Sequence, residues 1–135
     1  DGASGGFVNP FLYPDYKWDF RLPRVQSINA SGHKYGLVPP GLGWVIFKDR
    51  KVFNEDLVFY VNYLGGEAAT ATLNFSKSSA TVLVQYYQML RLGREGYTRI
   101  MKETLKHAEY LRDRLVATGK FQIMNETQRI PVVAP

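Results

Sequence analysis

The residues best suited to chemistry in this 135-residue chain form the segment Ser31-Gly32-His33-Lys34-Tyr35-Gly36, which directly follows a predicted strand. A lysine at a strand end, between glycine turns and beside an imidazole, has its backbone held by its neighbours and can lose its water. Desolvation disfavours the ammonium form, lowers the pKa of the amine and yields the neutral nucleophile that forms imines. The alternative is a solvated lysine in a surface turn, and spacing alone favours that alternative.

A second candidate is the segment Asp1-Gly2-Ala3-Ser4-Gly5-Gly6, in which a carboxylate precedes small residues. Small residues are expected where a ligand comes close to the backbone. The alternative is a surface aspartate ahead of a flexible loop, because most isolated charged residues are exposed. Neither segment decides the chemistry alone.

In combination, Asp1 and the Ser-Gly-His-Lys turn resemble the cofactor site of pyridoxal-phosphate enzymes with the aspartate-aminotransferase fold. A longer set of ordered segments resembles the glutamate decarboxylases, which are group II pyridoxal-phosphate-dependent decarboxylases. This resemblance covers about the first 100 residues, and the remainder resembles the family only in its helical pattern. The matching segments are Asp1–Pro10, Trp18–Pro23, Ser27–Lys34, Gly43–Val45, Tyr63–Gly65, Asn74–Ser76, Gln85–Tyr87 and Arg91–Gly93.

The resemblance implies that five residues hold pyridoxal 5'-phosphate. Lys34 corresponds to the lysine that binds the cofactor as an imine, and His33 to the imidazole against the ring face. Asp1 corresponds to the carboxylate that pairs with the pyridine nitrogen and keeps the ring protonated as an electron sink. Ala3 corresponds to the residue beneath the ring, and Ser31 to a hydroxyl near the phosphate.

The resemblance also implies an assembly of subunits. Phe75 and Ser76 correspond to a segment that reaches the phosphate from the partner subunit, although Ser76 could instead cap a helix. Tyr63 and Leu64 correspond to an arm near the neighbour's active site, with ordinary core packing of Tyr63 as the alternative. The expected active unit is therefore a homodimer or a higher homo-oligomer.

Two departures from the family pattern bear on specificity. Gly2 stands where many relatives have alanine, and Ala71 stands where many have an aromatic residue. The segments that bind the phosphate and the substrate carboxylates have no counterpart, and the chain has about a third of the family's length. The resemblance implies a parent protein that converts L-glutamate to 4-aminobutanoate and carbon dioxide, of which this chain is an inactive internal fragment.

Two further hypotheses stay open from the sequence. One is another decarboxylase or lyase of the same fold, acting on an aromatic amino acid or an amino alcohol phosphate. The other is a non-catalytic module whose exposed aromatic residues contact a partner, which predicts no imine at Lys34.

Composition limits the remaining classes of function. The 17 Lys and Arg residues exceed the 12 Asp and Glu residues by five, but they are dispersed in short pairs, so no nucleic-acid partner is expected. No uncharged stretch reaches the roughly 20 residues of a spanning helix, so a soluble protein without a membrane partner is expected. The absence of cysteine fits a reducing compartment, and the expected location is the cytoplasm. The lack of cysteine excludes disulfides and thiolate zinc sites, and no metal site is expected.

The elements that must position these residues follow from periodicity and turn chemistry. Strands are predicted over 25–30 and 44–47, with a hairpin or irregular arm over 56–76 around Gly65-Gly66. A helix is predicted over 78–92, ending or kinking at Gly93, followed by an amphipathic helix with Gly119 as its C-cap. The expected buried face of that second helix is Tyr97, Met101, Leu105, Ala108, Leu111 and Leu115.

Two short strands are predicted at the end of the chain, over 121–124 and 130–133. The order of elements favours an α/β fold with a mostly parallel sheet covered by helices. In the family's terms, residues 1–118 are expected to belong to the cofactor-binding large domain, and residues 119–135 to begin a smaller C-terminal domain.

Overall fold

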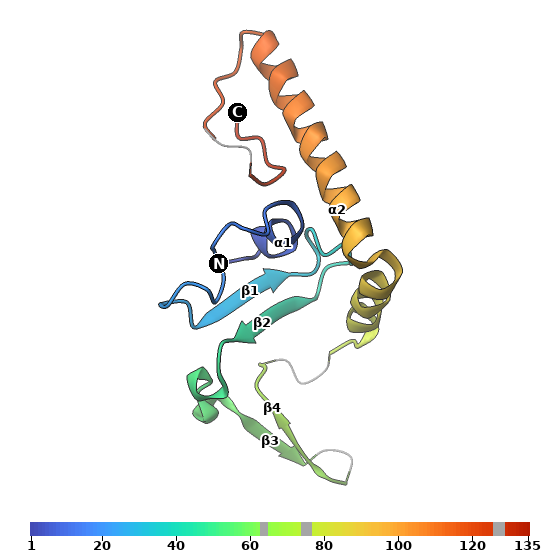
Figure 1. Cartoon of the computed structure of the whole chain (residues 1–135). Helices are drawn as coiled ribbons and strands as arrows, with labels where there is room; N and C mark the ends of the chain where they lie inside the picture. Colours follow the sequence, from blue (N-terminus) through green and yellow to red (C-terminus); the bar gives the residue numbers. More distant parts are fainter. Residues whose placement is uncertain (63–64, 74–76, 126–128) are drawn as a thin grey trace.

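The computed structural model of the chain describes residues 1–62, 65–73, 77–125 and 129–135. A two-stranded sheet lies at the centre, a long bent helix runs along one side of it, and a second hairpin projects from the far end (Figure 1). The helices and strands are α1 (Asn9–Leu12), β1 (Ser27–Ser31), β2 (Gly43–Phe47), β3 (Phe59–Asn62), β4 (Glu67–Thr70) and α2 (Ala80–Ala117).

The predicted strands at 25–30 and 44–47 are confirmed as β1 and β2, shifted by one or two residues. They pair antiparallel, with Ser27 opposite Phe47 and Ser31 opposite Gly43. The connection between them is a turn without a helix, and a parallel pair needs a longer crossover. The two strand pairings among the described residues are both antiparallel, which differs from the mostly parallel sheet expected.

A parallel neighbour of β1 is nevertheless indicated at its other edge, where the first three residues run. The Gly2 amide donates to the Asn29 carbonyl at 3.0 Å, and the Ser31 amide donates to the Ala3 carbonyl at 3.1 Å. Because residue numbers rise together in both bonds, the two segments run in the same direction.

The hairpin predicted within 56–76 is confirmed. β3 and β4 pair antiparallel from Phe59 opposite Thr70 to Asn62 opposite Glu67. Its large side chains are exposed, with Tyr60 showing 68% of its surface to solvent. Residues 63–64, to which an arm near a neighbour's active site was assigned, lie outside the described residues.

The predicted break at Gly93 is confirmed as a kink within α2. Gly93 has φ 56° and ψ −167°, so the helix consists of two straight halves that change direction there. Gly119 takes a φ of 67° just beyond the end of α2, and its amide donates to the Val116 carbonyl, which confirms its role as the C-terminal turn.

The predicted buried face of the second half of α2 is confirmed for Tyr97, Met101 and Ala108, but Leu111 is 51% exposed.

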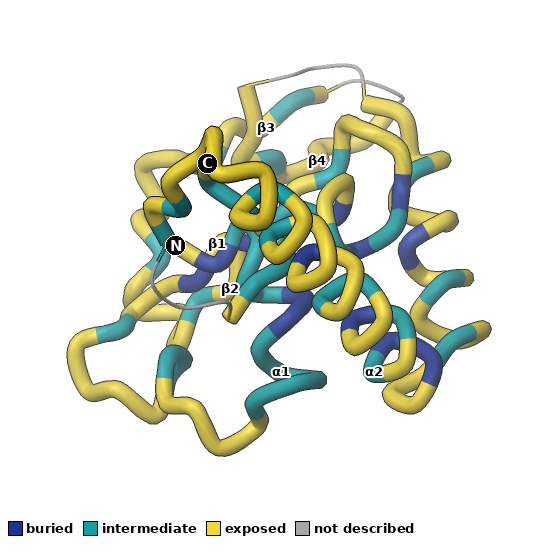
Figure 2. Tube along the Cα trace, turned by 90° about the horizontal axis from the view of Figure 1, so that it is seen from above, coloured by how far each residue is buried: buried dark blue, intermediate teal, exposed yellow. Residues whose placement is uncertain are grey.

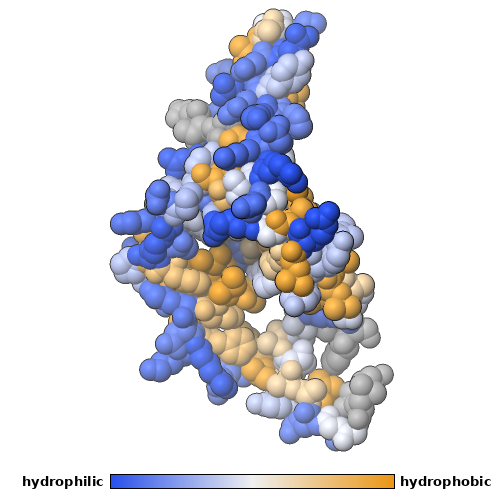
Figure 3. All heavy atoms as spheres, turned by 45° about the vertical axis from the view of Figure 1, so that its right-hand side comes forward, coloured by the Kyte–Doolittle hydropathy of each residue, from blue (hydrophilic) through white to orange (hydrophobic). Residues whose placement is uncertain are grey.

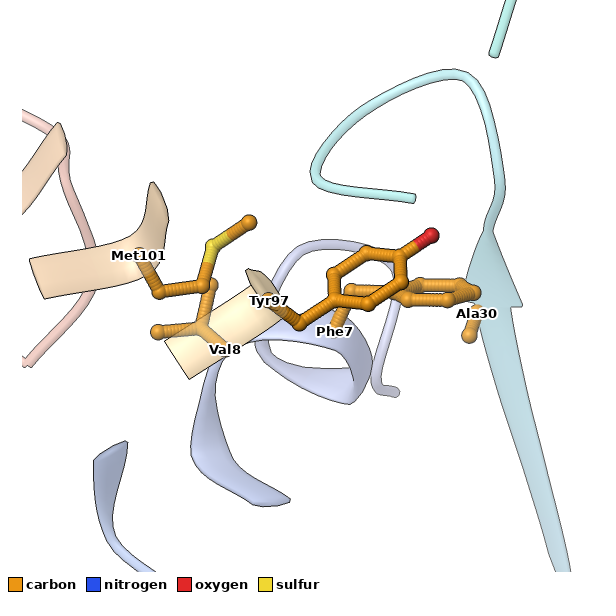
Figure 4. Close-up of a cluster of buried hydrophobic side chains, with 5 residues drawn as sticks. All are labelled: Phe7, Val8, Ala30, Tyr97 and Met101. Carbon is orange, nitrogen blue, oxygen red and sulfur yellow. The ribbon is translucent and has the colours of Figure 1, made fainter. Parts of the chain in front are cut away.

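The core gathers where η1 (Gly5–Phe7), α1 and the second half of α2 meet one face of β1. Its buried members are Phe7, Val8, Ala30, Tyr97 and Met101 (Figure 4). Along β1, the even-numbered Ile28 and Ala30 are buried and the residues between them are more exposed, as strand alternation requires. The core therefore supports the face of β1 that carries Ile28 and Ala30 and leaves Ser27 and Asn29 on the open face exposed. Figure 2 shows which parts of the chain are buried and which are exposed.

The two short strands predicted over 121–124 and 130–133 are wrong. The described part of this segment contains no regular strand, although the Met124 amide donates to the Ala134 carbonyl at 2.8 Å. A two-stranded ribbon is marginal without a third strand or a helix to cover it, which explains the irregular backbone. The boundary at residues 118 and 119 between two domains stays a prediction.

Candidate active site

The carboxylate of Asp1 is held on the open face of β1. Its Oδ1 accepts hydrogen bonds from the Ala3 amide at 2.8 Å and from Asn29 Nδ2 at 3.1 Å. Asn29 and Ser31 share this face, because side chains two residues apart on a strand point the same way. Asp1 itself is exposed.

Lys34 lies in a closed turn that begins where β1 ends. The Lys34 amide donates to the Ser31 carbonyl and the Leu37 amide donates to the Lys34 carbonyl, both at 3.3 Å. The Nδ1 atom of His33 lies 3.3 Å from the Leu42 carbonyl oxygen, which orients the imidazole. The side chains of His33 and Lys34 are exposed, so the described residues do not supply the expected desolvation of the amine.

One hydrogen-bonded path joins the two sequence candidates. Ala3 accepts from the Ser31 amide, and Ser31 accepts from the Lys34 amide, so the Asp1 segment and the lysine turn are both anchored on the end of β1. The structure thus brings Asp1, Ala3, Ser31, His33 and Lys34 to one end of this strand. Phe75 and Ser76 lie outside the described residues.

Beneath the lysine turn lies a buried polar cluster that the sequence analysis missed. Gln85 Nε2 donates to the Gly36 carbonyl at 2.9 Å, and the Tyr97 hydroxyl donates to the same oxygen at 3.0 Å. Burial raises the pKa of the Tyr97 hydroxyl, and the hydrogen bond from Gln85 partly opposes this rise. A signal was present in the sequence, since Gln85 and Gln88 are two amides three residues apart in the otherwise largely apolar stretch 80–90.

A cavity of about 520 Å³ also borders Asp1, on the side of Asn9, Trp18 and Gln26. Neither His33 nor Lys34 lines it, so this cavity is separate from the place where the sequence puts the reactive amine. Among the residues that the structure describes, no three His, Asp or Glu side chains gather as a metal site would require. No helix in the described part is both long and apolar enough to cross a bilayer.

Residues 1–134 match the pyridoxal-dependent decarboxylase conserved domain. The chain belongs to the pyridoxal-dependent decarboxylase family. It is 54% identical to glutamate decarboxylase 5 of Arabidopsis thaliana over 134 residues, which are 99% of this chain and 27% of that protein. The chain thus spans about a quarter of the length of this relative.

Solved structures of the family agree with the fold. The glutamate decarboxylase of Lactobacillus brevis superimposes with a TM-score of 0.87 at 50% identity, covering 97% of this chain and 30% of that one. The sphingosine-1-phosphate lyase of Burkholderia pseudomallei superimposes with a TM-score of 0.76 at 29% identity, covering 93% and 30%. The predicted α/β fold of pyridoxal-phosphate enzymes is therefore confirmed, with this chain as one part of it.

The family's cofactor is pyridoxal phosphate, and the residues present in this decarboxylase segment fit it. Within the described residues, the hydrogen bonds to the Asp1 carboxylate go to its Oδ1 atom. Its Oδ2 atom is therefore left for a protonated ring nitrogen. The small Gly2 and Ala3 follow it, as expected where a ligand comes close to the backbone. Lys34 supplies an exposed primary amine at the end of the same strand.

Proposed function

We propose that this chain is a segment of an enzyme that removes the α-carboxylate of L-glutamate to give 4-aminobutanoate and carbon dioxide. The observation that carries the proposal is the hydrogen-bonded path that anchors Asp1 and the Lys34 turn on one end of β1. The identity of 50–54% to proteins named glutamate decarboxylase supports this substrate.

Each residue of the site has a definite task in the proposed reaction. When bound, pyridoxal phosphate supplies an aldehyde and an electron-withdrawing ring that accepts the electron pair left by departing carbon dioxide. Lys34 would hold the cofactor covalently through its amine, and Asp1 would keep the ring nitrogen protonated. His33 would lie against the ring, Ala3 would leave room beneath it, and Ser31 would hold the phosphate.

The remaining part of the site comes from outside the described residues. We assign Phe75 and Ser76 to the phosphate site of a partner subunit, so that the active unit is at least a homodimer. We also place the protein in the cytoplasm. Because Lys34 is exposed in this segment, residues 1–135 alone are expected to show no turnover.

A second candidate function is that of a lyase of the same fold acting on an amino alcohol phosphate. The structural neighbour named as a sphingosine-1-phosphate lyase favours this alternative. Its identity of 29% is well below the 50% of the glutamate decarboxylase structure. The glutamate reaction is therefore the better supported of the two.

The test is cofactor capture and turnover by the full-length protein that carries this segment. After incubation with pyridoxal phosphate and reduction with borohydride, peptide mapping should find the cofactor on Lys34, and glutamate should yield 4-aminobutanoate. Lys34→Ala should lose the label and reduce turnover to background, because no other amine occupies this turn. Lys48→Ala, which removes an exposed lysine at the end of β2, is the matched control and should keep both. Full activity in Lys34→Ala would exclude the proposed function.

A further inference from the structure

The turn that carries Lys34 closes tightly around one buried side chain from α2. Gln85 is 1% exposed, and its Oε1 lies where a Cβ atom on either Gly32 or Gly36 would approach to 2.7 Å. Contacts of this length are too short for a real Cβ atom, so only glycine fits at both positions. The side chain of Gln85 therefore occupies the inside of the turn.

The Gly36 carbonyl is the point where the two halves of α2 converge on this turn. It accepts from Gln85 Nε2 at 2.9 Å and from the Tyr97 hydroxyl at 3.0 Å, so both of its lone pairs are used. Gln85 Nε2 also donates to the Tyr97 hydroxyl oxygen at 3.1 Å, which closes a triangle of hydrogen bonds. Gln85 precedes the kink at Gly93 and Tyr97 follows it.

The next carbonyl is held by the same helix face. Gln88 Nε2 donates to the Leu37 carbonyl at 3.3 Å, and Leu37 has a φ of 65°. A leucine in this left-handed conformation is strained and persists only where its surroundings hold it. The residues that follow Lys34 are thus held in an unfavourable backbone conformation by side chains of α2.

We propose that Gln85 and Tyr97 are positioning residues for Lys34, holding the turn from beneath so that its amine is presented at a constant place at the end of β1. This inference rests on the proposed function of Lys34. Gln85 and Tyr97 act through the Gly36 backbone, which lies two residues beyond the lysine. Because the cluster is buried and Lys34 is exposed, removing a donor would loosen the turn without changing the amine itself.

The experiment compares Tyr97→Phe and Gln85→Met with the wild-type full-length protein. Both substitutions remove a donor while nearly keeping the side-chain volume. The measured quantity is the rate at which the apo-protein captures added pyridoxal phosphate, monitored by absorbance. We expect this rate to fall by about five- to tenfold in each variant. Amide hydrogen exchange at Leu37 and Val38 should accelerate by a similar factor, because these amides close the turn.

Two controls separate positioning from general destabilisation. Tyr110→Phe removes an exposed hydroxyl from the same helix and should change neither readout. Met101→Ala opens a cavity in the core without removing a hydrogen-bond donor, so it should lower thermal stability while slowing cofactor capture less than Tyr97→Phe and Gln85→Met do.

The outcomes distinguish this inference from the proposed function. Wild-type rates of capture and exchange in Tyr97→Phe and Gln85→Met would overturn the positioning role while leaving Lys34 as the cofactor lysine. The same would follow if Met101→Ala slowed capture as much as they do. No label on wild-type Lys34 would overturn the proposed function, and with it the purpose assigned to these two residues.

Discussion

The two proposed cofactor-binding side chains, Asp1 and Lys34, depend on their surroundings for their positions. Both are exposed, and among the described residues backbone amides and the Asn29 amide hold them in place. Arg21, away from the candidate site, is likewise held by hydrogen bonds to its neighbours. Its guanidinium donates to Asp19 Oδ1 at 2.8 Å and to the carbonyls of Pro14 and Tyr16 at 3.0 and 2.7 Å. One side chain thus closes the loop between α1 and β1.

The Arg21–Asp19 pair predicts a pH dependence. The hydrogen bond from Arg21 lowers the pKa of Asp19, so the pair stabilises the folded protein at neutral pH and loses this effect as pH falls through the lowered pKa. Arg21→Gln should therefore be less stable than wild type at pH 7, and the difference should shrink below about pH 4. Urea unfolding of the full-length protein from pH 7 to pH 3 measures this. Arg24→Gln is the control, and a difference that stays constant with pH would contradict the assignment.

The kink in α2 is the element that connects the core to the lysine turn. Before Gly93 the helix supplies Gln85 and Gln88 to the turn, and after it the helix supplies Tyr97 to both the turn and the core. Tyr97 stacks on Phe11 with ring centroids 5.0 Å apart. A straight helix would point one of these two sets of side chains away from the Gly36 carbonyl.

Gly93→Ala tests this element. Gly93 combines φ 56° with ψ −167°, a region of backbone space that is essentially restricted to glycine. Open space surrounds its missing Cβ, so any cost comes from the backbone and not from a clash. We expect a loss of about 1–3 kcal/mol in the free energy of unfolding, measured by urea denaturation. Gly43→Ala is the control, because open space surrounds its missing Cβ and its φ is ordinary, and it should lower the free energy of unfolding by less than about 0.5 kcal/mol. Equal losses in the two variants would argue against a strained kink.

The described part of the chain leaves an apolar helix face exposed. The face of the first half of α2 opposite Gln85 is apolar and exposed, and Figure 3 shows apolar side chains gathered over this part of the helix. Its members are Leu83, Tyr86, Tyr87 and Leu90. Monomeric proteins rarely expose such patches.

Mixing two inactive variants tests the proposed sharing of sites between subunits. Lys34→Ala removes the amine, and Ser76→Asp should repel the phosphate through its negative charge. If Ser76 serves the partner's site, a mixed dimer of these variants contains one intact site, so random mixing should restore about a quarter of the wild-type activity. Each variant remixed with itself is the control. A fully active monomer in sedimentation, or mixtures that stay inactive, would contradict a shared site.

Local signals in the sequence determined much of this protein. The position of β1, the break at Gly93 and the turn at Gly119 follow from neighbouring residues, and each lies within a residue or two of its predicted place. The resemblance to the glutamate decarboxylases, on which the proposed roles of Asp1 and Lys34 depend, was also present in ordered segments of the sequence.

The tertiary structure alone decided how these parts meet. The bonds from Gln85 and Tyr97 to Gly36 span 49 and 61 residues, and no periodicity encodes which distant carbonyl an amide will reach. The antiparallel pairing of β1 with β2 depended on the turn between them, and the described residues after 120 form no regular strand. Turn and helix signals act between neighbours, whereas pairing and burial depend on which surfaces the whole chain brings together.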